Sequence, residues 1–122
     1  SLHRMGMRKN TLMNSACSVY VGHNSTGDWM LVERCMEGPG GPTGGGGCIV
    51  SNRLSFLLGL KGPSLTLTTD SSSSMTAVYL AAESLQHKGH GATADFGVGM
   101  GAQTMLTPVW WRQHCALGWV SY

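Results

Sequence analysis

Four consecutive serines, Ser71 to Ser74, follow an alternating run of apolar and hydroxyl residues in the segment SLTLTTDSSSS at 64–74. The alternation predicts a strand and the residues after it predict a helix, so the serines lie at the turn between the two. Backbone N–H groups are free at a helix start and the helix dipole is positive there, which suits a nucleophile and an oxyanion site. Ordinary capping by Asp70 or Ser71 gives the same pattern without any chemistry. The spacing alone favours caps.

Two histidine patterns offer weaker candidates for chemistry. His87 and His90 are three residues apart in QHKGH, a spacing that a metal ion uses, but zinc takes at least three protein ligands and no further cluster completes a site. His114 and Cys115 are neighbours in the sequence, and adjacency does not bring two side chains face to face as a catalytic pair. We therefore expect no metal.

The tryptophans and the glycine-rich segment have plain structural interpretations. Trp110, Trp111 and Trp119 have rings that could stack on a ligand, but packing inside a larger assembly is favoured. The segment EGPGGPTGGGG at 37–47 lacks the G-K-[ST] ending and the preceding strand of a phosphate-binding loop. It is interpreted as a connector.

Composition limits the classes of function. The chain has 122 residues, 42% of them hydrophobic and only 11% charged, which indicates one domain, or part of one, with too few charges to cover an independent surface. The net charge of +2 is spread along the chain, so we expect no nucleic-acid partner. No apolar run is long enough to span a membrane. Four widely spaced cysteines favour reduced intracellular thiols over a disulfide framework.

Hydrophobic periodicity and turn residues predict an α/β order of elements. The expected strands and helices alternate along the chain: a strand at 17–22, a helix at 48–62, a strand at 64–69, a helix at 72–89 and a strand at 92–101.

Two finer expectations concern the second helix and the tail. Met75, Val78, Ala82 and Leu85 form a stripe at helical spacing, which we expect to be the buried face. The tail at 106–122 is aromatic and is expected to be irregular.

Two blocks of this sequence resemble a known family. Asn52 to Ser55 (NRLS) and Leu60 to Ser64 (LKGPS), followed by the serine run and an alanine-rich helix, resemble the β-ketoacyl synthase (ketosynthase) domain of polyketide and fatty-acid synthases. The upstream VYVGHNSTGDW also resembles the family, and the double tryptophan in LTPVWW is similar to dinoflagellate polyketide synthases. The resemblance covers 17–122 and leaves 1–16 as an N-terminal extension.

This resemblance implies a fold and a site. The expected fold is part of a thiolase-like α/β/α/β/α fold, a fragment of its N-terminal half, with 64–69 as a central strand and 72–88 as a buried helix. Alignment through LKGPS places Ser71 where the family has its nucleophilic cysteine, while Thr68 and Asp70 replace the usual Asp and Ala. Ser72 to Ser74 are then turn and capping residues. The family's two histidine blocks are absent from the chain, so the chain alone is expected to be inactive.

The resemblance also implies a reaction and partners. The family condenses acyl and malonyl thioesters with loss of carbon dioxide, using substrates carried on the phosphopantetheine of an acyl carrier protein and no other cofactor. It implies a homodimer through the strand near 92–100 and an intracellular location, in the cytoplasm or a plastid. A serine hydroxyl stays protonated and needs a base to attack. Two alternatives therefore stay open: a decarboxylating or chain-initiating relative, and a non-catalytic domain that binds carrier protein.

Overall fold

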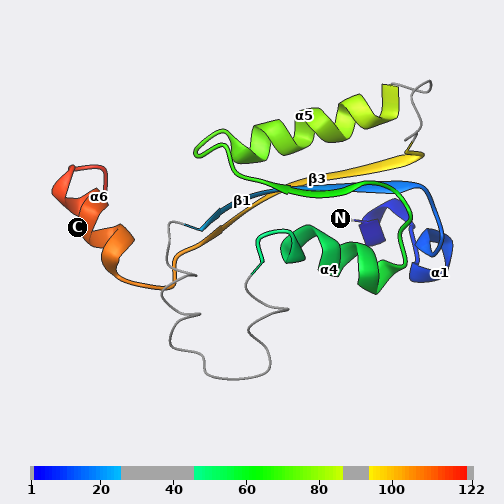
Figure 1. Cartoon of the computed structure of the whole chain (residues 1–122), viewed down its shortest axis with the longest axis horizontal. Coiled ribbons are helices and arrows are strands. Elements are labelled where there is room, and N and C mark those ends of the chain that lie inside the picture. Colours follow the sequence, from blue (N-terminus) through cyan, green and yellow to red (C-terminus); the bar gives the residue numbers. More distant parts are fainter. Residues whose placement is uncertain (1, 26–45, 87–93, 121–122) are drawn as a thin grey trace.

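The computed structural model describes residues 2–25, 46–86 and 94–120, and its centre is a parallel sheet with the strand order β2-β1-β3 (Figure 1). The strands are β1 (Cys17–Ser25), β2 (Ser64–Leu67) and β3 (Phe96–Thr104). Val19 pairs with Ser64 on one side of β1 and with Val98 on the other. The predicted α/β order is confirmed. Among the described strands, β1 lies between β2 and β3, and the expectation that 64–69 is a central strand of the complete fold stays a prediction.

Helices cover both faces of this sheet. Figure 1 shows α5 (Ser73–Gln86) along one face, with α4 (Ile49–Leu58) and the N-terminal segment on the other. That segment contains a short 3-10 helix, Leu2–Met5, and the single turn α1 (Lys9–Leu12). Because parallel strands need a crossover between them, α5 connects β2 to β3 across one face.

The first long helix ends earlier than predicted. The prediction was 48–62, but Gly59 takes a left-handed conformation with φ 65° and closes α4 by donating its N–H to the carbonyls of Phe56 and Ser55. Only glycine adopts this conformation without a steric cost from Cβ, so the helix stops there.

The C-terminal tail contains a helix, and the expectation of irregular structure is wrong. Helix α6 spans Val109–Ala116, after Pro108 with φ −71°. Proline already has the φ of a helix start. Gly118, with φ 69°, lies just beyond the end. The prediction followed the aromatic composition of the tail and overlooked Pro108 and Gly118, which are ordinary residues for the start and the end of a helix.

The sheet face toward α4 and the N-terminal segment holds the apolar core. Alternate residues of β1 point to this face, and they pack with the N-terminal segment and the residues before β2. The buried members are Leu12, Cys17, Val19, Val21 and Leu60. Residues 1–16, which the sequence set apart as an extension, therefore contribute Leu12 to the core.

The opposite face is lined by glycines, and α5 lies very close to it. A Cβ built on Gly99 would lie 2.8 Å from the Cα of Val78, and one on Gly97 would lie 3.0 Å from the carbonyl oxygen of Ala81. Real Cβ atoms essentially never approach as closely as the first of these. Gly22 and Gly101 would meet Ser73 and Ser74 in the same way. The sheet therefore accepts this helix only because side chains are missing.

The buried face of α5 differs from the predicted stripe. The residues it buries are small, at four-residue spacing: Ser73, Ala77 and Ala81. In contrast, Met75 is 72% exposed and Val78 is 50% exposed. Ala82 and Leu85 are exposed as well. The prediction followed hydrophobicity, whereas the close approach of helix and sheet selects for size.

Candidate functional site

The turn between β2 and α5 is held by its own serines. The Ser73 hydroxyl accepts a hydrogen bond from the Thr69 N–H (2.9 Å) and donates one to the Asp70 carbonyl (2.6 Å). The Ser72 hydroxyl donates to the Thr69 carbonyl at 2.7 Å. Ser73 is only 5% exposed. The prediction that these two serines are turn residues is confirmed, because their hydroxyls form hydrogen bonds with backbone groups of the turn.

Asp70 has a different role from the cap that the sequence suggested. Its backbone is left-handed, with φ 54°, a conformation that Asp and Asn tolerate better than other side chains. Its carboxylate accepts a hydrogen bond from the Asn24 amide (Nδ2 to Oδ1, 3.1 Å). Asn24 lies near the end of β1, so this contact ties the turn to the neighbouring strand.

Thr68, at the position where the family resemblance has an aspartate, also connects the turn to β1. Its hydroxyl donates to the His23 carbonyl at 2.7 Å. On the other side, the His23 ring (Nε2) and the Thr104 hydroxyl are 3.1 Å apart and hydrogen-bonded. Hydroxyl side chains thus join the ends of all three strands, and the turn after β2 is fixed relative to the sheet.

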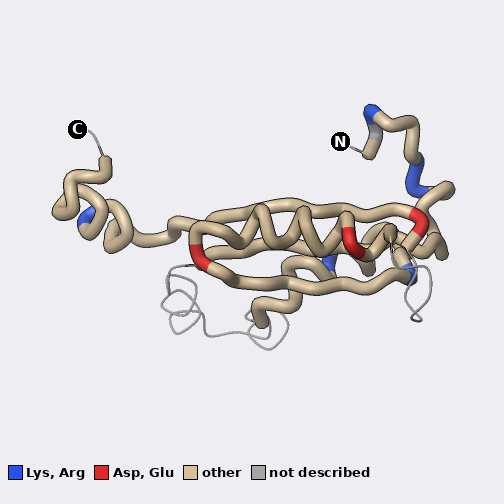
Figure 2. The backbone as a smooth tube through the Cα atoms, turned by 90° about the horizontal axis from the view of Figure 1, so that it is seen from above, with Lys and Arg blue, Asp and Glu red and all other residues tan. Residues whose placement is uncertain are grey.

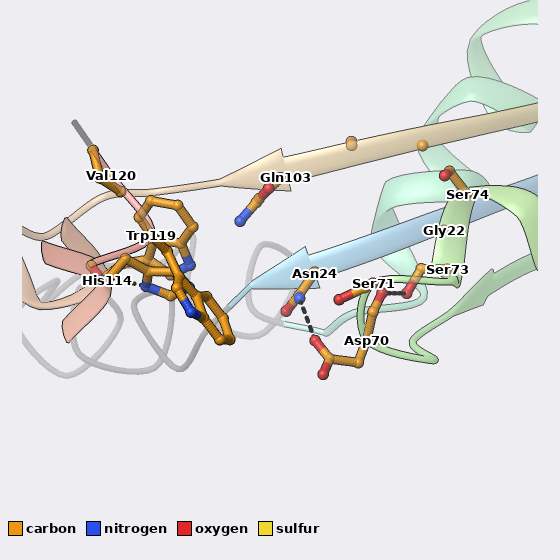
Figure 3. A pocket seen from close by; sticks show the side chains of 13 residues that line it. Gly22, Asn24, Asp70, Ser71, Ser73, Ser74, Gln103, His114, Trp119 and Val120 are labelled. Atoms are coloured by element: carbon orange, nitrogen blue, oxygen red, sulfur yellow. Dashed lines mark hydrogen bonds between the residues drawn. The ribbon is translucent and has the colours of Figure 1, made fainter. Parts of the chain in front are cut away.

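Ser71 is exposed at this turn and lines a cavity of about 940 Å³ at the carboxyl ends of the strands. Open α/β sheets bind their ligands in the crevice outside these ends. The cavity has a polar wall with Asn24, Asp70 and Gln103, and an aromatic wall with Trp110, His114 and Trp119. Figure 3 shows Ser71, Asp70 and Asn24 on one side and His114 and Trp119 on the other.

The aromatic wall is an ordered stack. The rings of His114 and Trp110 lie 3.7 Å apart at 18°, and Trp119 meets His114 edge-on at 5.4 Å. His114 Nδ1 is 2.8 Å from the Trp110 carbonyl. A carbonyl oxygen only accepts, so Nδ1 carries the proton and Nε2 of a neutral ring is left as an acceptor.

The structure sorts the candidates that the sequence offered. It brings Ser71, Trp110 and Trp119 to one cavity, together with His114, while Trp111 and Cys115 do not line it. His87 and His90 lie outside the described residues. Among the residues that are described, no three possible metal ligands are grouped.

Two polar residues of this cavity were missed by sequence reasoning. Asn24 and Gln103 are register partners near the ends of β1 and β3. Each follows a run of strand residues, which is the one signal the sequence held, but their pairing depends on a register that the sequence does not state.

Comparison with known families supplies the context for this turn. The sequence model of the β-ketoacyl synthase N-terminal domain matches residues 1–122. The chain belongs to the β-ketoacyl synthase family. The predicted resemblance is thereby confirmed, while the likeness of the double tryptophan to dinoflagellate sequences stays a prediction.

Relatives of this β-ketoacyl synthase chain include bacterial and fungal polyketide synthases. A mycocerosic acid synthase-like polyketide synthase of Mycobacterium tuberculosis is 38% identical over 112 residues, which are 89% of this chain and 5% of that relative. The highly reducing polyketide synthase rstn3 of Aspergillus nomiae is 40% identical over 89 residues, 70% of this chain and 4% of that relative. The chain therefore spans a small part of these proteins.

Solved ketosynthases share the fold. The oxazolomycin ketosynthase domain of Streptomyces albus superimposes with a TM-score of 0.75 at 28% identity, covering 96% of this chain and 20% of that one. The ketosynthase from module 6 of the bacillaene synthase of Bacillus subtilis gives 0.69 at 27%, covering 95% and 18%. The thiolase-like fold predicted from the sequence is confirmed.

The described residues also bear on two broader expectations. Figure 2 shows their lysines and arginines scattered along the chain, without a cluster on one face. Of the helices that the structure describes, none is both long enough and apolar enough to cross a bilayer.

Proposed function

We propose that this chain carries the nucleophile position of a polyketide-type ketosynthase and that Ser71 occupies this position. The observation that carries the proposal is the exposed Ser71 at a strand-to-helix turn, open to the cavity at the sheet's carboxyl edge. The neighbouring Ser73 is buried and has both its hydrogen bonds within the turn. Of these two serines, only Ser71 is placed to meet a substrate.

The proposed reaction is decarboxylative condensation. In acyl transfer, a bond forms between the Ser71 oxygen and the acyl carbon, the thioester C–S bond breaks, and the hydroxyl proton goes to the released carrier thiol. A malonyl thioester then loses carbon dioxide, and the resulting carbanion attacks the acyl group and displaces the Ser71 oxygen, which takes up a proton from water to restore the hydroxyl. The positive end of the α5 dipole supports the negative charge on the carbonyl oxygen in both steps, while the N–H groups of Ser72 and Ser73 are already bonded to the carbonyls of Thr69 and Asp70.

A second candidate is favoured by the chemistry of the Ser71 side chain. A hydroxyl needs an adjacent base to become a nucleophile, and its oxygen ester is a poorer electrophile than a thioester. Decarboxylation of a malonyl thioester, which starts a chain without an acyl intermediate on the protein, avoids both difficulties. A scaffold that binds carrier protein without chemistry is the third possibility.

The substrates and partners follow from the family. We infer that acyl and malonyl groups arrive on the phosphopantetheine of an acyl carrier protein. We also infer a homodimer that pairs the β3 strands of two copies, because β3 lies at an edge of the described sheet and edge strands offer unpaired backbone groups. Sedimentation velocity of the full-length protein tests the dimer.

Placing a thiol at residue 71 tests the position directly. In the full-length protein, S71C is expected to react with iodoacetamide at least about tenfold faster than S73C, because a helix start lowers the pKa of an exposed thiol. S73C is the matched control, since it adds the same thiol to the same turn at a buried position. Acyl transfer from a carrier thioester should appear, or rise, only in S71C. Equal alkylation of the two thiols contradicts a nucleophile position at residue 71.

Removing the hydroxyl separates the three candidates. S71A abolishes condensation if the acyl group is held on Ser71, and it leaves malonyl decarboxylation nearly intact if the protein only decarboxylates. A scaffold shows neither reaction in the wild-type protein and still binds carrier protein in S71A. Equal loss of activity in S71A and S73A indicates a purely structural serine turn.

A further inference from the structure

The charge on the side chains that line the cavity beside Ser71 is of one sign. It is lined by 13 residues, and among them Asp70 is the only Asp, Glu, Lys or Arg. Its carboxylate is exposed and accepts a hydrogen bond from Asn24, a neutral amide that orients the charge without cancelling it. Among the described lining residues, an anionic substrate group therefore meets a carboxylate and no lysine or arginine.

The wall across the cavity attracts positive charge through its aromatic rings. The face of an indole carries negative charge density and binds ammonium groups, and tryptophan is the strongest of the aromatic side chains in this respect. Among the described residues, Trp119 lines the cavity with 73% of its surface exposed. The stack of His114 on Trp110 leaves Trp119 in contact with the histidine by an edge-on approach. A carboxylate and an exposed indole thus border one space.

We propose that this cavity selects acyl groups that carry a positive charge, namely short aminoacyl thioesters. The inference rests on the proposed function and names the substrate class of the same site. The acyl carbonyl lies at the start of α5 beside Ser71, and the ammonium group lies between the carboxylate of Asp70 and the ring of Trp119. An ammonium bound there also neutralises Asp70 before a malonyl thioester, itself an anion, enters the same cavity.

A neutral acyl chain is the competing occupant, since aromatic rings also pack against hydrocarbon. Apolar packing against the rings would favour a butyryl group at least as much as a β-alanyl group of the same length, whereas the cation–π contact favours the ammonium. Asp70 adds to the preference for the ammonium, because a carboxylate attracts an ammonium and repels another carboxylate. Charge, at constant shape, is therefore the property that an experiment should vary.

Two isosteric probes and a third, slightly larger probe of opposite charge show how the charge of the acyl group affects binding. They are amides of N-acetylated ethylenediamine with β-alanyl, butyryl and succinyl groups, in which N–H replaces the thioester sulfur so that binding occurs without transfer. Calorimetric titration of the full-length protein at neutral pH should show the β-alanyl probe binding about tenfold more tightly than the butyryl probe. This estimate combines one exposed cation–π contact with one exposed ion pair. The succinyl probe should bind most weakly.

Substitutions in the two walls of the cavity show which residues cause the preference for the β-alanyl probe. D70N keeps the shape and tolerates the left-handed backbone, because Asn also favours that conformation, and it should reduce the preference to about three- to fivefold, the share left to the cation–π contact once the charge pairing is lost. W119L should weaken the β-alanyl probe by about three- to fivefold, as expected for an exposed cation–π contact. W111L is the matched control, since Trp111 does not line the cavity but meets Trp110 edge-on at 5.0 Å, and it should leave the ratios between the three affinities unchanged.

Each outcome decides the proposal. A preference for the β-alanyl probe that falls in both D70N and W119L supports it. Equal affinity for the three probes, binding of none of them, or a preference that is undiminished in D70N overturns it. Acyl transfer to S71C provides the separate test of the proposed function: transfer without a charge preference leaves the ketosynthase assignment standing and removes only the aminoacyl specificity.

Discussion

The two faces of the sheet are built from different kinds of side chain. Toward α4, Val19 and Val21 are fully buried and pack with Leu12 and Leu60 in an ordinary apolar core. Toward α5, glycines lie at alternate positions of β3, and the residues of the helix that face them are alanine and serine. One face is stabilised by apolar side chains, and the other brings two backbones together.

The second face also uses hydrogen bonds. Ser18 is fully buried, and its hydroxyl is 2.8 Å from the hydroxyl of Ser84 on α5. Ser18 also donates to the Phe96 carbonyl at 3.3 Å. The hydroxyls of Ser18 and Ser84 therefore both have partners at this interface, as buried hydroxyls usually do. Close backbone contact and these hydrogen bonds fix the position of α5 on the sheet. They therefore also fix the serine turn, where α5 begins.

The largest effect is expected from a single methyl group on the α5 face. A Cβ on Gly22 would overlap the backbone of Ser73, and a backbone cannot move aside as a flexible side chain can. We expect G22A to lower the free energy of unfolding by about 3 kcal/mol or more, at the upper end of overpacking effects. Urea unfolding followed by circular dichroism measures this loss.

A second glycine provides the control for this substitution. Nothing lies within 4 Å of a Cβ built on Gly47, so G47A should change the free energy of unfolding by less than about 1 kcal/mol. Similar losses in G22A and G47A would show that close approach is not what sets the α5 face. Retained stability in G22A would do the same.

The sequence predicted the type and position of the helices and strands better than it predicted which side of a helix is buried. Alternation in SLTLTT and the glycine after the first long helix predicted a strand and a helix at almost their observed places. The buried side of α5 was predicted wrongly because Met75 and Val78 are the larger apolar residues. The correcting signal was present in FGVGMG, where alternate glycines mark a close approach of another backbone.

The candidate site was predictable only where it is local. Ser71 belongs to one continuous motif, so its place at the turn follows from neighbouring residues. The cavity also needs Asn24 and Gln103, which are nearly 80 positions apart and meet through strand register. It needs α6 as well, whose aromatic residues gave no helical pattern. Long-range pairing of this kind is not encoded in any short stretch.

A smaller, pH-dependent effect is expected on the α4 face. Burial raises the pKa of the Cys17 thiol, so the unfolded chain releases this proton at a lower pH than the folded chain. The contribution of the protonated Cys17 thiol to the free energy of unfolding is therefore fully present below the ordinary thiol pKa of about 8.5. It is lost as the pH rises through the higher pKa of this thiol in the folded chain. We expect the free energy of unfolding to decline on the alkaline side, and C17A to flatten the decline.

A neighbour in the same core separates this titration from packing. Val19 is as fully buried as Cys17 but has no proton to release, so V19A should lower stability equally at all pH values and keep the alkaline decline. A decline of the same size in C17A and in the wild-type chain would assign it to other groups.

The smallest effect is expected on the outward side of α5. Met75 is 72% exposed, and exposed substitutions away from special features change stability by less than about 0.5 kcal/mol. M75A, which keeps a good helix former, should therefore unfold at nearly the same urea concentration as the wild-type chain. A77V, two residues further along and on the buried side, provides the contrast, because Ala77 is fully buried and added methyl groups there cost about 1–3 kcal/mol. A large loss in M75A together with none in A77V would mean that the helix packs through its apolar stripe, and the two-face description would have to be reversed.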